Sequence, residues 1–303
     1  MPDSPDGLLV IDKPSGPTSH DIVAAVRRML KISRVGHTGT LDPMASGVLP
    51  LVLGRATRLA RFLSASRKTY LAHVRLGAAT DTYDAEGRVE PVIAQTPGQA
   101  ITVEEIEAVL AAFRGSFLQT PPPFSAKKVD GVRAYAMARE QRTVRLEPVP
   151  VTVYDLALCG RTDEEIRIRV TCSAGFYVRT LAHEIGARLG TGGYLTALRR
   201  TAAAGFSEAD AIPLAELAEA PEAALPRVVP MDGLLLDMPA ARLTAAGVTH
   251  AVQGRDLGPA DLDGAPPPAW PAWVRLLDEG GRLVGLGEPR GAPAVLHPSV
   301  VLK

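Results

Sequence analysis

Two short stretches of this chain alternate between a mainly apolar and a mainly polar set of side chains, and this pattern limits the fold most. The stretches are residues 69–76 and 165–172. A period of two is typical of a strand with one buried face and one face in water. The sequence therefore predicts two half-buried strands. The side chains expected on the buried faces are Tyr70, Ala72, Val74, Leu76, Ile166, Ile168, Val170 and Cys172.

Isolated helices are indicated between the predicted strands. A hydroxyl residue at 18–19 can cap a helix whose apolar stripe includes Ile22. Thr102 and Glu105 have the spacing of a capping box, and a further helix is expected from about 177 to 189. Strands followed by isolated helices and hairpin-like turns predict an α+β fold with a mainly antiparallel sheet.

The length of 303 residues suits one large domain and one small domain. A stretch rich in Ala, Glu and Pro at 211–230 indicates the boundary. We expect a catalytic domain over 1–230 and a small β-rich domain over 231–303. Two apolar runs within 274–286 flank an Asp-Glu-Gly-Gly turn and predict a hairpin in the small domain.

Several classes of protein are disfavoured by the composition. No apolar run reaches the length that spans a bilayer. The acidic, Pro-rich start at 1–7 is unlike a signal peptide. Cys159 and Cys172 are the only cysteines, and their spacing matches no zinc or redox motif. These features predict a soluble protein of the reducing cytoplasm, with no metal site and no membrane partner.

Positive charge is concentrated in the larger part of the chain, although the formal net charge is zero. Residues 1–210 hold 26 Lys and Arg against 22 Asp and Glu, and residues 211–303 hold 7 against 11. The segment 121–146 is basic and also contains Phe124 and Tyr135. Basic groups interleaved with aromatic rings suit a nucleic-acid surface, although an ordinary solvated loop fits equally well. The basic residues of this segment include Lys127, Lys128 and Arg133.

Asp42 is the most informative residue, because it lies in a loop rich in glycine and is followed by Pro43. Glycines such as Gly39 let the backbone approach a ligand closely, and proline restrains the turn after the carboxylate. An Asp-Pro pair alone is usually only a turn. The surrounding motif decides between these two interpretations.

Five motif blocks resemble those of the bacterial tRNA pseudouridine-55 synthases, the TruB family. The blocks follow one another in the order and spacing of that family. The residues that carry the resemblance are Leu9 to Asp21 with its Asp-Lys-Pro-Ser-Gly-Pro-Thr-Ser core, Gly36 to Leu49 around Asp42, Arg67 to Tyr70, Gly175 to Leu181, and Tyr194 to Thr201.

The resemblance implies an isomerase that converts the T-loop uridine of tRNA, position 55, to pseudouridine. The N1–C1′ bond breaks and the base rejoins through C5, so no cofactor is expected. A carboxylate beside C1′ is required, as in glycoside-cleaving enzymes. In the family the aspartate, here Asp42, either attacks C1′ or removes a sugar proton to give a glycal, and the sequence leaves both routes open.

The resemblance also assigns roles to residues around Asp42. Arg179 matches an arginine that pairs with the catalytic carboxylate, and Tyr70 matches a tyrosine that stacks on the flipped base and is a candidate to handle the C5 proton. Tyr177 and Leu198 match positions that line the uridine pocket. Without the motif, core packing would explain both tyrosines and Leu198, and a surface salt bridge would explain Arg179.

Two further residues lie in matched blocks. His37 matches a histidine that supports the flipped-out RNA, although a local hydrogen bond would otherwise explain it. Lys13 follows a buried strand and is expected to have a structural role or to contact a phosphate.

The resemblance further implies a pseudouridine synthase core and a PUA-like C-terminal domain. The expected partner is the tRNA T-arm, and we expect a monomer. Three alternatives remain: a non-catalytic RNA chaperone, a nucleoside hydrolase or glycosidase, and a paralogue that modifies another RNA. The set of Asp42, Tyr70 and Arg179 disfavours a pure binder, and the single placed acid disfavours a hydrolase.

Overall fold

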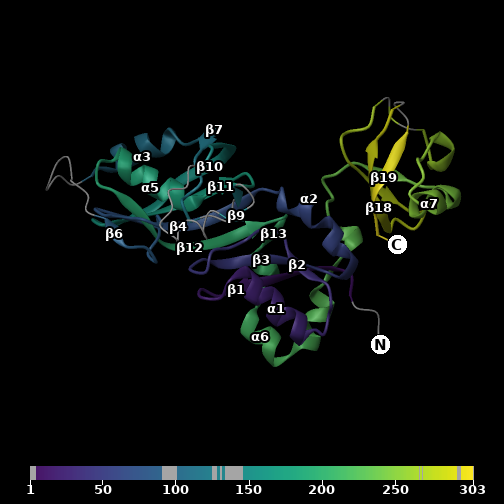
Figure 1. Cartoon of the computed structure of the whole chain (residues 1–303), viewed down its shortest axis with the longest axis horizontal. Helices are drawn as coiled ribbons and strands as arrows, with labels where there is room; N and C mark the ends of the chain where they lie inside the picture. Colours follow the sequence, from purple (N-terminus) through teal and green to yellow (C-terminus); the bar gives the residue numbers. More distant parts are fainter. Residues whose placement is uncertain are drawn as a thin grey trace.

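The computed structural model describes residues 5–90, 101–124, 128–129, 132–133, 146–265, 267, 269–291 and 295–302. Its main feature is an eleven-stranded sheet that runs through the larger part of the molecule (Figure 1). The strands of this sheet are β1 (Gly7–Lys13), β2 (Val35–His37), β3 (Ser46–Leu53), β4 (Lys68–Leu76), β7 (Gly115–Gln119), β10 (Val149–Arg161), β11 (Glu165–Cys172), β12 (Gly193–Ala203), β13 (Phe206–Ser207), β14 (Ile212–Pro213) and β15 (Val229–Pro230).

The strand order along the sheet is β14-β1-β3-β12-β4-β11-β10-β7. Neighbouring strands on this path are antiparallel except at two positions, where β1 pairs with β14 and β3 pairs with β12 in parallel. The predicted α+β class with a mainly antiparallel central sheet is therefore confirmed. Two short hairpins lie apart from the sheet and consist of β5 (Ala79–Thr80) with β6 (Val89–Glu90), and β8 (Lys128–Val129) with β9 (Val132–Arg133).

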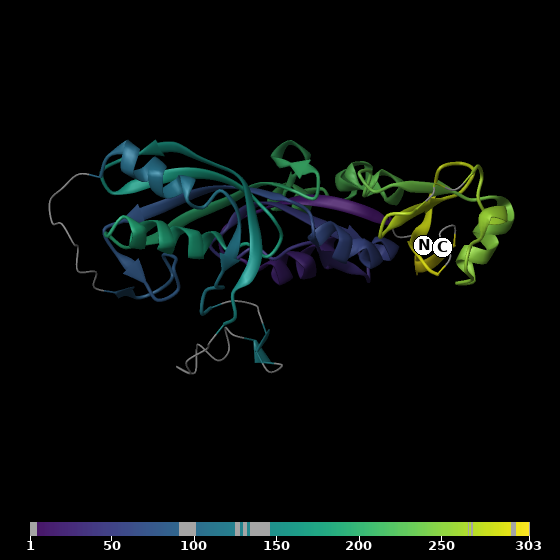
Figure 2. The same ribbon diagram turned by 90° about the horizontal axis from the view of Figure 1, so that it is seen from above.

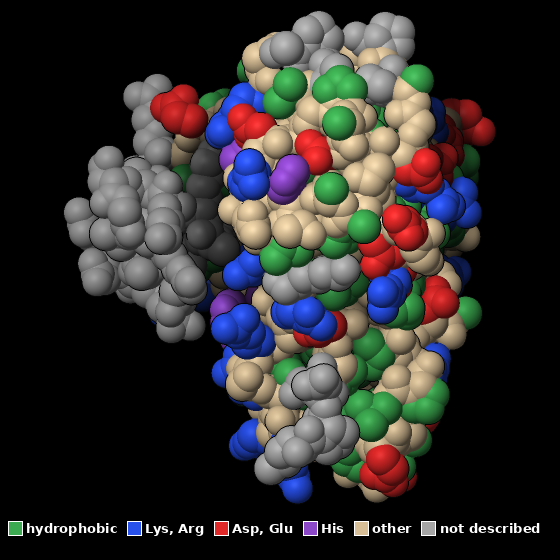
Figure 3. Space-filling view, turned by 90° about the vertical axis from the view of Figure 1, so that its right-hand side faces the viewer, with side chains coloured by type: hydrophobic (Ala, Val, Ile, Leu, Met, Phe, Trp, Pro, Cys, Tyr) green, Lys and Arg blue, Asp and Glu red, His purple; other side chains and the backbone are tan. Residues whose placement is uncertain are grey.

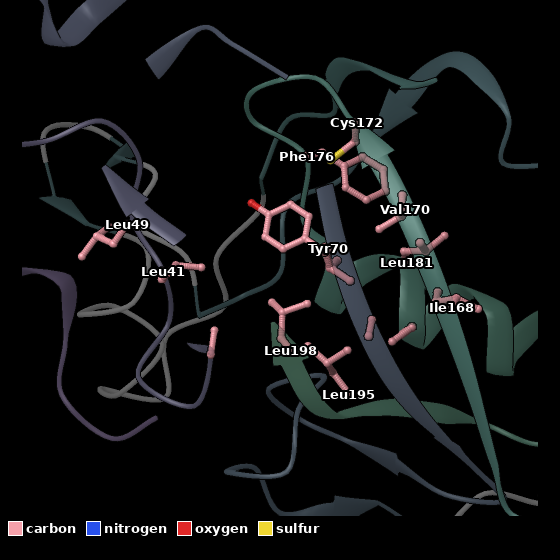
Figure 4. Packing of buried hydrophobic residues seen from close by; sticks show 14 of the residues in the cluster. Leu41, Leu49, Tyr70, Ile168, Val170, Cys172, Phe176, Leu181, Leu195 and Leu198 are labelled. Atoms are coloured by element: carbon pink, nitrogen blue, oxygen red, sulfur yellow. The ribbon is translucent and has the colours of Figure 1, made fainter. Parts of the chain in front are cut away.

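The two alternating stretches form the neighbouring strands β4 and β11, in which Tyr70 pairs with Val170 and Ala72 with Ile168. Their predicted buried faces are confirmed: all eight side chains are less than 9% exposed. Leu71 lies on the other face and is 40% exposed. Figure 4 shows how the Tyr70 ring packs with Phe176 and Leu198, which come from other parts of the chain.

Capping side chains define where the helices begin. Thr18 caps α1 and Thr102 caps α3, each with the reciprocal bond of a capping box. The segment 54–64 begins as a 3-10 turn (Gly54–Leu59) and continues as α2. The helices of the larger part are α1 (Ser19–Met29), α2 (Ala60–Ser64), α3 (Val103–Ala111), α5 (Val178–Arg188) and α6 (Leu214–Glu219).

The C-terminal part contains a separate four-stranded sheet in the order β16-β17-β18-β19. The hairpin predicted from the Asp-Glu-Gly-Gly turn is confirmed as β17 and β18. We call this part, residues 240–302, the C-terminal lobe; it lies at one end of the elongated molecule (Figures 1 and 2). Its elements are β16 (Ala240–Arg242), α7 (Ala245–Val252), β17 (Val274–Leu277), β18 (Leu283–Pro289) and β19 (Leu296–Val301).

An apolar cluster joins the lobe to the core: Leu286 and Leu302 of the lobe pack in it with Val48 and other core residues. Arg55 also donates to the carbonyl of Leu302 at 3.0 Å. The division of the chain at 230/231 and the PUA-like character of the lobe stay predictions. Among the described residues, no helix is both long enough and apolar enough to cross a bilayer.

Candidate active site

The loop between β2 and β3 carries Asp42, and Ser19 of α1 binds this loop. The Ser19 hydroxyl, which is fully buried, donates to the carbonyl of Leu41 at 3.1 Å and accepts from its N–H at 2.8 Å. Both polar groups of the residue before Asp42 are thus satisfied by one side chain. The side chain of Asp42 is left 36% exposed, so the carboxylate is fixed at its base and accessible to a substrate.

Lys13 holds the same loop from the end of β1. Its ammonium donates to the carbonyls of Pro14, Pro43 and Ala45 at 2.9, 3.1 and 2.6 Å. The side chain is fully buried, and burial lowers its pKa to about 8. All three N–H donors of the ammonium are used inside the protein. These contacts support the structural role expected for Lys13, and they leave no donor for a phosphate.

Arg179 faces Asp42 from the first turn of α5. The guanidinium Nε lies 2.9 Å from Asp42 Oδ2, and Nη2 donates to Oδ1 at 3.3 Å. The Arg179 side chain is only 8% exposed. A buried cation opposite an accessible carboxylate attracts that carboxylate and fixes its orientation.

Asp84 is a second carboxylate on Arg179, and it lies outside the matched motif blocks. Arg179 Nη1 donates to Asp84 Oδ2 at 3.2 Å, and the Asp84 side chain is 4% exposed. The other oxygen of Asp84 accepts from the Thr82 hydroxyl at 2.6 Å and from the N–H of Glu86 at 3.1 Å. Arg179 is therefore held between one buried acid, which has no path to a substrate, and one accessible acid.

A cavity of about 260 Å³ opens beside Asp42. It brings together five of the predicted site residues: Asp42, Tyr70, Tyr177, Arg179 and Leu198. Figure 4 shows the Tyr70 ring between Phe176, above it, and Leu198, below it, with Leu41 to its left. The remaining lining residues are Gly39, Thr40, Leu41, Ser64, Lys68, Ser173, Ala174, Gly175, Phe176 and Val178.

Comparisons with known proteins identify this arrangement. The family described as TruB family pseudouridylate synthase, N-terminal domain, matches residues 27–178, and the tRNA pseudouridylate synthase B C-terminal domain matches 179–237. A tRNA pseudouridine synthase B from Solibacter usitatus is 44% identical over 98% of this chain and 100% of its own length. The corresponding protein of Aquifex aeolicus is 40% identical over 98% and 99%.

The chain belongs to the TruB family. It is therefore a tRNA pseudouridine synthase, and pseudouridine synthases are isomerases. Among solved structures, a Cbf5-Nop10-Gar1 complex contains a chain that is 26% identical, with a TM-score of 0.76, over 98% of this chain and 85% of that one. A chain in the structure of an H/ACA RNP bound to a substrate RNA containing 2′-deoxyuridine is 25% identical, with a TM-score of 0.73, over 98% and 85%.

Two buried cations support the pocket of this TruB-family enzyme, and sequence reasoning did not single them out. Lys68 donates to the carbonyls of Ser64 and Ser66, both at 2.8 Å, and burial lowers its pKa to about 8. Arg200 is fully buried and donates to the carbonyls of Val48 at 2.7 Å and Gly39 at 3.2 Å.

Gly39 is required where the catalytic loop passes these cations. A Cβ on Gly39 would lie 3.2 Å from Lys68 Cε and 3.6 Å from Arg200 Nη1, and its φ of +153° is rare for other residues. Both cations lie in matched motif blocks, Arg67 to Tyr70 and Tyr194 to Thr201. Their position in these blocks could have pointed to them as site residues, but the sequence does not show that their side chains are buried.

The first turn of α5 is held by Gln119, at the end of β7. Its amide donates to the carbonyl of Tyr177 at 3.0 Å and accepts from the N–H of Tyr177 at 2.8 Å. Gln119 is 1% exposed, so this pairing is shielded from water. It fixes the backbone at Tyr177, which lines the cavity, two residues before Arg179.

His37 lies outside the set of residues that line the cavity. Its Nδ1 accepts from the N–H of Gly39 at 3.3 Å, and its ring packs edge-on against His20 with 5.2 Å between centroids. Burial lowers the pKa of His37, so the neutral ring is favoured. Its role toward RNA stays a prediction. Lys127 lies outside the described residues, as do the side chains of Lys128 and Arg133.

Proposed function

We propose that this enzyme isomerises uridine 55 in the T-loop of tRNA and that Asp42 is the carboxylate that reacts at the sugar. The observation that carries the proposal is the pairing of accessible Asp42 with buried Arg179 at a cavity lined by Tyr70 and Leu198. A charged acid, an oriented partner and an apolar slot are what cleavage of an N-glycosidic bond requires.

The reaction conserves every atom of the uridine. The C1′–N1 bond breaks, a C1′–C5 bond forms, the proton leaves C5, and N1 gains a proton. Asp42 serves this reaction either as a nucleophile at C1′ or as a base for the C2′ proton that leads to a glycal. Both routes use the charge of the carboxylate, which the guanidinium of Arg179 holds in place.

The base must leave the stack before it reaches Asp42, which costs roughly a few kcal/mol. The ring of Tyr70, which is 7% exposed, offers a stacking surface, and Tyr177 and Leu198 border the same cavity. Burial raises the pKa of Tyr70, so its phenol is neutral in the free enzyme. Tyr70 therefore handles the C5 proton as a hydroxyl group and not as a preformed phenolate.

The remaining roles follow the family resemblance. His37 supports the flipped-out RNA, and Lys127, Lys128 and Arg133 of the basic segment contact the backbone of the T-arm. The C-terminal lobe is a PUA-like domain that binds RNA. The enzyme acts as a monomer in the cytoplasm and needs no cofactor.

Replacing Asp42 by Asn tests the chemical assignment. We expect Asp42→Asn to bind unmodified tRNA with the affinity of the parent protein and to lose turnover by roughly 10⁴-fold or more, because only the chemical step needs the charge. Binding is measured by filter retention of labelled tRNA. Turnover is measured by tritium release from uridine labelled at C5.

The matched control is Asp155→Asn, which changes an exposed acid on the far face of the sheet and should retain turnover. Full tritium release from Asp42→Asn would contradict the role of Asp42. Absence of tritium release from the parent protein would indicate a binding protein, and free uracil as product would indicate a hydrolase. Mapping of pseudouridine at a position other than 55 would contradict the T-loop assignment alone.

A further inference from the structure

The loop that carries Asp84 is attached to α5 by Arg179. Arg179 Nη1 donates to the Thr82 carbonyl at 3.3 Å and to Asp84 Oδ2 at 3.2 Å. The residue between these two acceptors is Tyr83. Its carbonyl accepts from the N–H of Leu195 at 3.0 Å, so the backbone of the loop also contacts β12.

Tyr83 attaches the same loop to α5 a second time, through its ring. The ring lies 3.9 Å from that of His183, centroid to centroid, with an angle of 14° between the planes. His183 follows Arg179 by four residues in α5. Residues four apart in a helix lie on one face, one turn from each other. The ion pair and the ring stack therefore hold one loop against one face of one helix.

The backbone of Tyr83 is in a conformation that a tyrosine rarely adopts. Its φ is +65°, which is left-handed, and such a conformation costs a residue with a Cβ on the order of 1–3 kcal/mol. Glycine or asparagine would fit this backbone better. The unfavourable backbone conformation of Tyr83 can be offset only by the contacts of its ring. We infer that the ring is the reason for a tyrosine at this position.

The surroundings of His183, on α5, also indicate that ring stacking is the important contact. Its Nδ1 is buried and has no hydrogen-bond partner among the described residues. An imidazole that is placed for hydrogen bonding satisfies its ring nitrogens when they are buried. The contact that the His183 ring makes is therefore the stacking of its flat face on the ring of Tyr83.

We propose that Tyr83 and His183 are positioning residues for pseudouridine formation: their stack holds Asp84 on Arg179, and Arg179 holds Asp42. The inference rests on the proposed role of Asp42. Without the stack, one of the two attachments of the loop to α5 is lost, and Asp84 moves away from Arg179. The guanidinium is then free to tilt away from Asp42, and an error of about 1 Å at a reacting group reduces turnover by up to roughly 100-fold.

Variants at both rings test this proposal on full-length protein with unmodified tRNA. His183→Ala removes one ring, and Tyr83→Gly removes the other while relieving the left-handed backbone, which keeps the test valid if His183→Ala folds poorly. We expect each to lower kcat about 10-fold or more, with KM for tRNA within about twofold. His183→Phe restores a flat ring without ring nitrogens and should recover most of kcat.

The Asp84→Asn background shows whether the stack acts through Asp84. Adding His183→Ala to Asp84→Asn should lower kcat by less than threefold, since the two changes interrupt one path. Independent losses that multiply, unchanged kcat in both single variants, or a loss confined to KM would each overturn the proposal. If Asp42→Asn is inactive while His183→Ala and Tyr83→Gly are fully active, only the positioning role fails; if Asp42→Asn is active, the proposed function fails.

Discussion

The core and the C-terminal lobe have interiors of opposite character. Five charged side chains of the core are less than 9% exposed, whereas in the described part of 231–303 only Asp278 is a charged residue at that level. The interior of the lobe is an apolar cluster around Leu276 and Val284. On the face seen in Figure 3, the charged groups of both signs are interspersed at the surface. The five buried charged residues of the core are Lys13, Lys68, Asp84, Arg179 and Arg200.

The difference in buried charge indicates that the catalytic site lowers the stability of the core. A buried charge needs a partner, and the desolvation of a pair often exceeds its attraction. All five charges lie within the catalytic loop, its supports or the cavity beside Asp42. Among its described residues the lobe buries only Asp278 as a charged side chain, and its interior is otherwise apolar. We therefore propose that the lobe contributes to tRNA binding rather than to the chemical step.

Replacing Arg179 by Met should give the largest effect and separates the two regions most clearly. Two carboxylates then lose one shared cation, so we expect kcat to fall by on the order of 10²–10³ and the free energy of unfolding to fall by about 3–5 kcal/mol. Tritium release and urea denaturation measure these quantities. A variant with parental turnover would show that Asp42 needs no partner.

Replacing Leu276 by Ala tests the lobe in the same way. Leu276 is fully buried in the lobe, so truncation should lower the stability of the lobe by about 2–5 kcal/mol. We expect kcat at saturating tRNA to remain unchanged, because the cavity residues lie elsewhere. Hydrogen exchange of the lobe amides measures the stability. A fall in kcat equal to that of Arg179→Met would remove the contrast between the two regions.

Lys13→Met tests the buried charge of the core through the pH dependence of the free energy of unfolding. Burial lowers the pKa of Lys13 from 10.5 to about 8, so between these values the unfolded chain holds the proton and the folded chain releases it. The stability of the parent protein relative to Lys13→Met should therefore rise as the pH increases from 8 to 10.5, and it should be constant below that window. Urea denaturation at several pH values measures the difference. Parallel curves would show that Lys13 keeps an ordinary pKa.

Arg290→Ala should have the smallest effect. The Arg290 side chain is 59% exposed and lies 3.6 Å from Asp256 at the surface of the lobe. Such pairs contribute about 0–1 kcal/mol, so the midpoint of urea denaturation should hardly move. A loss comparable with that of Leu276→Ala would mean that ion pairs, and not apolar packing, stabilise the lobe.

Local patterns accounted for a large part of the fold. The alternation in β4 and β11, the capping boxes at Thr18 and Thr102 and the hairpin of the lobe all appear as predicted, because each depends on residues that are neighbours in sequence. Arg179, 137 residues from Asp42, was assigned to the site by the matched block Gly175 to Leu181, through family resemblance and not through physics.

The sequence by itself determined several of the elements, the buried faces of β4 and β11, and the presence of one carboxylate in a glycine-rich loop. Only the tertiary structure decided that Asp84 shares Arg179, that Lys13 is buried, and that Tyr83 lies on His183. The physical reason is that a charged or polar side chain has no periodicity that reveals burial. Whether it is solvated or paired depends on which distant strand or helix the folded chain brings against it.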